Sequence, residues 1–135
     1  MESARYKREE GTTRTKSYAF AIRIVRMVQY LRETRGEHVL SKQVLRAGTA
    51  IGALVREAEY AQSPADFANK LSVALKEANE TEYWLQLLHD TDYLDAEAFK
   101  SIESDCKELI ALLVASIKTA KTNANERAKR QHSTT

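Results

Sequence analysis

Acidic side chains and a histidine, residue types that bind metals and transfer protons, cluster between residues 77 and 90. The members of this cluster are Glu77, Glu80, Glu82, His89 and Asp90. A di-iron site in a helical bundle needs Glu and His three residues apart on two helices, with further Glu on the other two. Glu80 stands where that spacing requires His, and Gln86 precedes His89 by three residues. The spacing therefore predicts no metal site and no cofactor.

The nucleophilic side chains give no sign of catalysis. Ser41 and Cys106 are not accompanied by the His and Asp arrangement that would activate them, so we expect a protein that is not an enzyme and has no small-molecule substrate. The single cysteine cannot form an internal disulfide and fits a reducing cytoplasm. No apolar run is long enough to span a membrane, and the first ten residues do not resemble a signal peptide. We expect no membrane partner.

Arginine and lysine are the side chains of this sequence that most strongly suggest contact with a partner. Arginine and lysine neutralise phosphates, which is the sequence-independent basis of nucleic-acid binding. The candidate contacts to RNA or DNA are Arg23, Arg26, Arg32, Arg35, Lys42 and Arg46, with Arg127, Lys129 and Arg130 as a flexible supplement. Binding of this kind should weaken steeply with salt and show little sequence preference.

The charges are arranged in three blocks, although the net charge is only +2. Residues 1–56 carry twelve basic and five acidic side chains (+7), residues 57–117 carry four and thirteen (−9), and residues 118–135 carry five and one (+4). The positive blocks could therefore face a polyanion. They could equally pair with the negative block, across the bundle or between subunits, and Arg46 with Glu77 or Glu80 would be such an internal pair. The sequence leaves both interpretations open.

Helical periodicity runs through most of the chain, which holds one proline and four glycines. Residues 1–15 lack this periodicity and are predicted to form a flexible basic arm. A first helix is expected from about Lys16 to Gly36, with two apolar stripes, and a second from about Val39 or Ser41 to Ala61. Gly48 and Gly52 lie inside the second helix, where a glycine costs about 1 kcal/mol, and indicate close packing of this small-residue face, which we expect to meet the third helix.

Ser63 and Pro64 mark the start of a third helix, because serine caps a helix and proline suits its first position. This helix should reach Asp90, and Asp95 should cap a fourth that runs to about Lys121. Residues 122–135 are predicted to form a flexible basic tail, either a frayed helical end or a disordered segment. The expected fold is an all-α, up-and-down antiparallel four-helix bundle over residues 16–121. The aromatic residues expected in its core or in an interface, rather than as base-stacking platforms, are Tyr60, Phe67, Tyr83 and Trp84.

Residues 41–94 resemble the small bacterial four-helix bundle proteins related to those encoded in intervening sequences of 23S ribosomal RNA genes, called S23-like. The matching segments are residues 41–53 (SKQVLRAGTAIGA), 57–58, 63–67 (SPADF), 70–71, 74–78 (ALKEA), 80–85 (ETEYWL) and 93–94. The family usually carries Ser-Ile-Pro-Ala-Asn where residues 50–54 read AIGAL. Glycine thus stands in place of the proline, and Leu54 in place of the asparagine.

The resemblance implies a left-handed antiparallel bundle similar to those that assemble as ring-shaped homopentamers. A more distant similarity links the fold to the accessory variability protein of diversity-generating retroelements, a basic pentamer that works with a reverse transcriptase and nucleic acid. Our leading interpretation is a cytoplasmic, homo-oligomeric bundle that binds nucleic acid, with RNA as the favoured ligand. The alternative is a protein interaction or scaffolding module with no nucleic-acid role.

Overall fold

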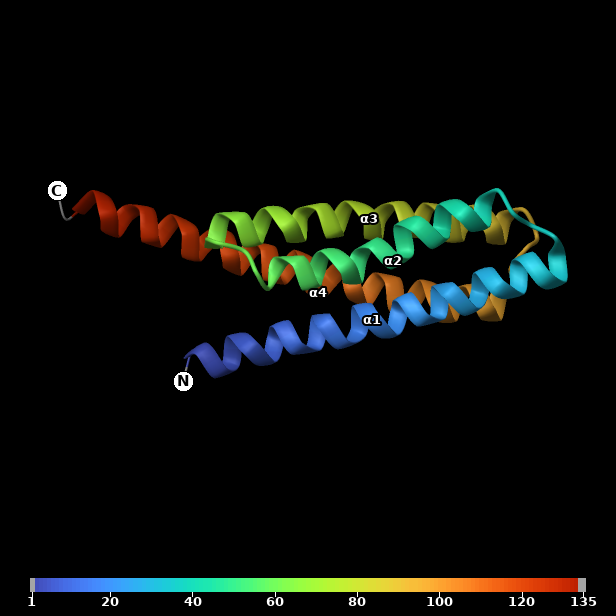
Figure 1. Cartoon of the computed structure of the whole chain (residues 1–135), viewed down its shortest axis with the longest axis horizontal. Coiled ribbons are helices and arrows are strands. Elements are labelled where there is room, and N and C mark those ends of the chain that lie inside the picture. The colour runs from blue at the N-terminus through green and yellow to red at the C-terminus, as the bar shows by residue number, and fades with distance from the viewer. Residues whose placement is uncertain (1, 134–135) are drawn as a thin grey trace.

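The computed structural model describes the backbone of residues 2–133 and the side chains of residues 12–131. Four helices make up this part of the chain: α1 (Glu2–Arg35), α2 (Leu40–Ala58), α3 (Pro64–Asp90) and α4 (Ala96–Ser133). Consecutive helices run in opposite directions and pack side by side, as Figure 1 shows. The predicted all-α class with four helices is confirmed, and the helix contacts are those of a bundle.

Single residues at the turns explain where α1 ends and where α3 and α4 begin. Gly36 follows α1 with a φ of +64°, a conformation that glycine adopts without strain. The Ser63 hydroxyl accepts a hydrogen bond of 3.1 Å from the backbone N–H of Asp66 at the start of α3. The Asp95 carboxylate accepts one of 2.8 Å from the N–H of Ala98 in α4. Each acceptor satisfies an N–H that the helix itself leaves unpaired, so these boundaries agree with the prediction.

The ends of the chain are organised differently from our expectation that the bundle begins near Lys16 and that helix gives way near Lys121. In the structure α1 is helical from Glu2 and α4 is helical to Ser133. A helix propagates readily once formed, and neither stretch contains a proline to stop it. Thr13, which we placed in the arm, is buried. The flexibility of both ends stays a prediction, and residues 1 and 134–135 lie outside the described residues.

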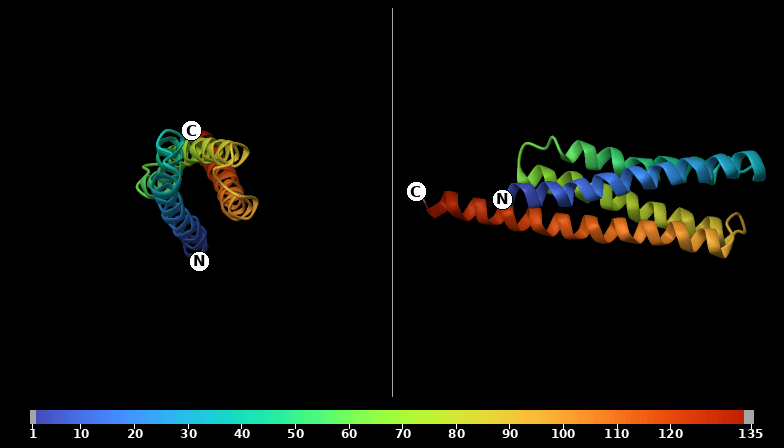
Figure 2. Two further views of the ribbon diagram at one scale, coloured as in Figure 1. Left: turned by 90° about the vertical axis from the view of Figure 1, so that its right-hand side faces the viewer. Right: turned by 90° about the horizontal axis from the view of Figure 1, so that it is seen from below.

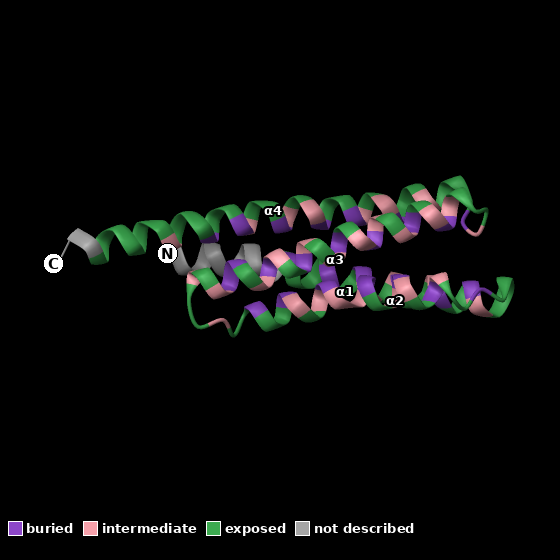
Figure 3. Cartoon of the chain, turned by 90° about the horizontal axis from the view of Figure 1, so that it is seen from above, coloured by how far each residue is buried: buried purple, intermediate pink, exposed green. Residues whose placement is uncertain are grey.

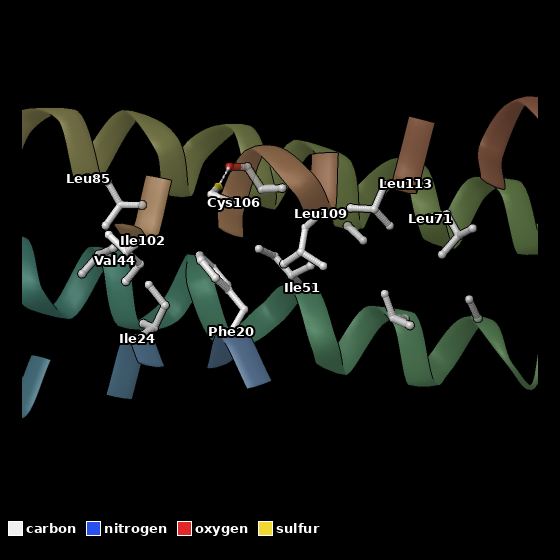
Figure 4. Close-up of a cluster of buried hydrophobic side chains, with 14 of the residues drawn as sticks. Phe20, Ile24, Val44, Ile51, Leu71, Leu85, Ile102, Cys106, Leu109 and Leu113 are labelled. Atoms are coloured by element: carbon white, nitrogen blue, oxygen red, sulfur yellow. Dashed lines mark hydrogen bonds between the residues drawn. The ribbon is translucent and has the colours of Figure 1, made fainter. Parts of the chain in front are cut away.

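The core is a layer of apolar side chains that runs the length of the bundle (Figures 3 and 4). All four helices contribute residues at helical spacing. Central members are Phe20, Ile24, Val44, Ile51, Leu71, Leu85, Ile102, Cys106, Leu109 and Leu113. Of the two stripes expected on the first helix, the one with Phe20 and Ile24 faces the core. Much of the other stripe, Tyr18, Ile22 and Val25, is exposed to solvent.

Gly48 and Gly52 allow α1 to approach α2 closely. A Cβ at Gly48 would lie 2.8 Å from Cγ1 of Ile24, and a Cβ at Gly52 would lie 3.3 Å from the carbonyl oxygen of Ser17. Both distances are shorter than ordinary van der Waals contact, so a side chain at either position would force its neighbour on α1 to shift. The close packing predicted for these glycines is confirmed, but the partner is α1 and not the third helix, which the sequence led us to expect against this small-residue face.

The bundle is least closed between α1 and α4. These two helices contact each other much less than the other neighbouring pairs do. In the end view of Figure 2 they form the two ends of an open arrangement, with α2 and α3 between them. A hollow of about 550 Å³ lies along this seam, lined among others by Met27, Tyr30 and Ile102. The charged side chains that cross the seam are therefore important for how the bundle closes.

Candidate nucleic-acid interface

Arg23 of α1 pairs with side chains and backbone of α4. Its guanidinium forms an ion pair of 2.6 Å with Asp105 and donates hydrogen bonds to the hydroxyl of Ser101 at 3.0 Å and to the Ser101 carbonyl at 3.3 Å. Lys16, two turns before Arg23 on α1, pairs across the same seam with Glu108, one turn after Asp105 on α4. Both ion pairs link the two helices that otherwise touch least, so Arg23 is neutralised within the chain.

Arg46 of α2 is likewise neutralised, by two carboxylates of α3. Its guanidinium lies 2.6 Å from Glu80 and 3.2 Å from Glu77. The hydrogen bond from Arg46 lowers the pKa of the Glu80 carboxyl against the opposing effect of burial, and the Trp84 indole N–H adds a hydrogen bond of 3.2 Å. The internal pair that the sequence left open is confirmed.

Arg32 and Arg35, at the end of α1, are held by neutral acceptors. Arg32 donates to the hydroxyl of Ser41 at 3.3 Å. Arg35 donates to the carbonyl of Asp92 at 3.0 Å and lies over the Tyr93 ring, 5.1 Å from its centroid. Neutral partners position a guanidinium without cancelling its charge, and each guanidinium keeps further N–H donors for an anion.

Arg26 and Lys42 are two further exposed cations of this half of the molecule. Neither forms an ion pair within the described residues, and both side chains are exposed. Arg26 borders the hollow between α1 and α4. Lys42 lies in the first turn of α2, near the end of the bundle where α1 also ends (Figure 1). Together with Arg32 and Arg35 they leave four uncancelled positive charges toward this end.

The remaining candidates, Arg127, Lys129 and Arg130, lie in the last turns of α4 and are exposed. Figure 1 shows the end of α4 at the opposite end of the molecule from the α1–α2 turn. The nine predicted residues therefore do not form one continuous surface. The structure separates them into two neutralised arginines, one group toward the α1–α2 turn and one group on the end of α4.

Sequence reasoning missed several of the residues that neutralise the cations. It anticipated Glu77 and Glu80, because Arg46 occupies a face of the second helix that must meet the third. It did not anticipate Asp105 or Glu108, which lie far from Arg23 and Lys16 in the sequence. No local pattern signals such a pair, since it depends on how α4 returns beside α1.

The aromatic residues divide between core and surface. Phe67 is buried and Trp84 is half-buried. Tyr60 and Tyr83 are 85% and 57% exposed, so they are not core residues of the single chain. Tyr60 lies just past the end of α2, and Tyr83 lies on an exposed face of α3, so the expectation that they belong to an interface stays a prediction. Tyr83 packs edge-on against Trp84, with ring centroids 5.0 Å apart.

Among the described side chains, those suited to metal binding do not gather at one place. No three residues of the His, Cys, Asp and Glu types gather there in a way that could hold a metal ion. His89 stacks on Phe99, and its Nδ1 lies 2.9 Å from the carbonyl oxygen of Leu94, so its surroundings are those of a structural residue. His132 lies outside the described side chains. Within the described chain, no helix combines the length and hydrophobicity needed to cross a membrane.

Comparison with known proteins places most of the chain in one group. Residues 9–115 match the family model described as 23S rRNA-intervening sequence protein. A solved structure from Bacteroides thetaiotaomicron, described as a protein of unknown function from the S23 ribosomal protein family, is 53% identical. It superimposes with a TM-score of 0.80, over 82% of this chain and 98% of that one. The comparison with curated proteins gives no match.

Proposed function

Because this chain belongs to the 23S rRNA-intervening sequence protein family, we propose that it is a non-enzymatic, cytoplasmic, homo-oligomeric bundle that binds nucleic acid, RNA above all, through uncancelled surface cations. The observation that carries this proposal is the state of the nine candidate residues. Arg26, Lys42, Arg127 and Lys129 are exposed and have no carboxylate partner within the described residues, while Arg32 and Arg35 have only neutral partners.

Uncancelled cations are the groups that phosphates need. Each contact releases counterions from the nucleic acid, so affinity rises with the number of contacts and falls steeply with salt. The planar guanidinium also matches two phosphate oxygens at once. Arg23 and Arg46 contribute less to such binding, because a phosphate would have to displace a carboxylate that already occupies the guanidinium.

The exposed stripe of α1 supports self-association. Tyr18, Ile22 and Val25 lie on one face, and Tyr18 is 56% exposed. Large apolar residues on a contiguous exposed face are typical of a protein interface. We infer that a second copy covers this stripe, in the ring-shaped arrangement that the family resemblance implies. The cations toward the α1–α2 turn would then be repeated around the ring.

The test compares variants with the same change of charge. Fluorescence anisotropy with a labelled, structured RNA at about 50 mM salt should detect binding, because phosphate contacts are strongest at low salt. Arg26→Gln combined with Lys42→Gln should weaken binding severalfold and lower the salt dependence by nearly two ion equivalents.

The matched control is Arg23→Gln combined with Arg46→Gln, which removes two cations that are already neutralised. This control should bind closer to the wild type once its folding has been verified by circular dichroism. Absence of wild-type binding at low salt would overturn the proposal. Equal losses in the two double variants would overturn the assignment of the site.

The alternative is an interaction or scaffolding module, favoured by the two arginines that carboxylates of the same chain neutralise. In that case the positive block of one subunit would dock on the negative block of the next. Native mass measurement with and without nuclease separates the two functions. Nucleic acid that co-purifies and disappears on nuclease treatment supports binding, whereas a stable oligomer free of nucleic acid supports the module.

A further inference from the structure

The last part of α4 extends beyond the rest of the bundle, as Figure 1 shows. Among the described side chains of α4, Ala120 is the last buried one and Ala124 is the last half-buried one. Asn125 lines the same hollow as Ala65, in the first turn of α3. Residues 126–131 are exposed and continue the helix past that point.

The extension of α4, residues 118–131, lies outside the segment that matches the family model. The family match ends at residue 115, and the similar solved structure is matched over 98% of its own length by 82% of this chain. The chemistry of residues 118–131 is therefore judged from this chain alone.

The composition of this end of α4 indicates which class of partner it can bind. Residues 118–131 contain five basic side chains and one acidic one, and no apolar residue larger than alanine. Helices that enter a membrane surface or the groove of another protein need large apolar anchors. This segment has none, so its polar and cationic side chains fit a polyanion whose contacts are ionic.

The cations point to different sides of the helix. Successive residues are rotated by about 100°, so Arg127 and Lys129 project in nearly opposite directions, and Arg130 projects between them. Upstream, the Leu113, Ile117 and Ala120 side of α4 is covered by the bundle, whereas every residue from 126 to 131 is exposed. A helix with cations around its circumference can contact two rows of phosphates at once.

We propose that the end of α4, residues 118–131, is a nucleic-acid-binding helix whose exposed last part, residues 126–131, enters a groove of a double-stranded nucleic acid and contacts the phosphates on both walls. This inference rests on the proposed function and assigns its principal contact to α4 rather than to α1 and α2. The major groove of B-form DNA is wide enough for an α-helix, while that of A-form RNA is deep and narrow. DNA and RNA duplexes are therefore separate arms of the test.

The decisive variant removes three charges from the extension of the full chain, as Arg127→Gln, Lys129→Gln and Arg130→Gln together. Because these side chains are exposed, thermal unfolding should match the wild type. Binding to a labelled DNA duplex, measured between about 50 and 200 mM salt, should weaken at least tenfold, and the salt dependence should fall by about 2.7 ion equivalents.

The matched control is Lys76→Gln, Lys100→Gln and Lys107→Gln, which removes the same charge from exposed positions in the acidic half of the molecule. It should retain most of the wild-type affinity. Equal losses in the two triple variants, or a loss only in the Arg26 and Lys42 variant, would overturn this inference and leave the proposed function intact. Absence of wild-type binding to any duplex or single strand would overturn both.

Three further arms identify the ligand. An RNA duplex of the same sequence, a single strand, and vesicles containing anionic lipid are tested with the wild type and the extension variant. Extension-dependent binding to either duplex supports the inference. Extension-dependent binding to the single strand or to vesicles alone would overturn it, because neither presents two phosphate rows along a groove.

Discussion

Glu37 is a buried carboxylate that organises the turn between α1 and α2. Its two side-chain oxygens accept hydrogen bonds from the backbone N–H groups of Ser41 at 2.7 Å and Val39 at 3.2 Å. Burial alone would raise its pKa, but the backbone hydrogen bonds outweigh that effect and lower the pKa below its ordinary value of 4.5. The carboxylate thus satisfies donors that the first turn of α2 leaves unpaired.

Glu37→Gln should destabilise the protein by about 1 kcal/mol near neutral pH, the usual cost of a lost helix cap. A lowered carboxyl pKa contributes stability that is present above about pH 4.5 and disappears as the pH falls through the folded-state pKa. The free energies of unfolding of the wild type and the variant, measured in urea, should therefore become equal as the pH falls below the folded-state pKa of Glu37. The control is Glu33→Gln, an exposed acid one turn earlier on α1, and a difference that persists unchanged in acid would contradict the role assigned to Glu37.

Cys106 is fully buried, and its thiol donates to the carbonyl of Ala78 at 3.4 Å. Burial, followed by the charges of Glu82 and Glu103, raises its pKa to about 12. Since the thiolate is the reactive form, we expect no alkylation by iodoacetamide in the native protein at mildly alkaline pH and complete alkylation after unfolding. Ser104→Cys, exposed on the same helix, should react at an ordinary rate. Labelling of Cys106 with the helices intact would refute this prediction.

At the scale of the element, the contact between α1 and α2 depends on the absence of a side chain at Gly48. Alanine in its place would gain about 1 kcal/mol of helix propensity. Its Cβ would press against Ile24, which is completely buried, and overpacking costs about 1 to 3 kcal/mol.

We therefore expect Gly48→Ala to destabilise the protein in urea unfolding, whereas Gly52→Ala, with a looser contact, should change stability less. Truncation of Ile24 to alanine removes the clashing atoms, so Gly48→Ala should cost less in that background. A more stable Gly48→Ala protein would contradict the close approach of the two helices.

At the scale of the whole molecule, α1 is the helix with the weakest attachment. It packs on α2 but contacts α4 little, and the Arg23–Asp105 and Lys16–Glu108 pairs cross the seam at exposed positions. Exposed ion pairs contribute about 0.2 to 1 kcal/mol each and are screened by salt. Opening of α1 should therefore require less free energy than unfolding of the whole bundle.

Native-state hydrogen exchange should show faster exchange of α1 amides than of α3 amides, with the gap widening at high salt. Arg23→Gln should widen it further. Lys70→Gln, which removes the 3.1 Å pair with Glu57 between the closely packed α2 and α3, should have little effect on exchange in α3. Equal exchange of all four helices would mean that the molecule opens only as a unit.

The predicted helix boundaries succeeded where a single residue controls the outcome. Gly36, Ser63 and Asp95 act through their own backbone conformation or through an N–H three residues away, so local sequence contains the necessary information. The helix bounds at the two ends of the chain could not be predicted, because residues 2–15 and 122–133 lack apolar periodicity and helix can continue without it.

The sequence by itself determined the helical class, the turns and the close packing at the two glycines, because these follow from residue type and spacing along one helix, but it did not determine that α1 is the helix that packs there. Only the tertiary structure decided which cations are neutralised. Arg23 and Asp105 are 82 residues apart, and their pairing depends on the rotation of α1 and α4 about their own axes. The same rotation decided which apolar stripe of α1 is buried, and the unequal lengths of the packed helices left the cations of α4 beyond the bundle.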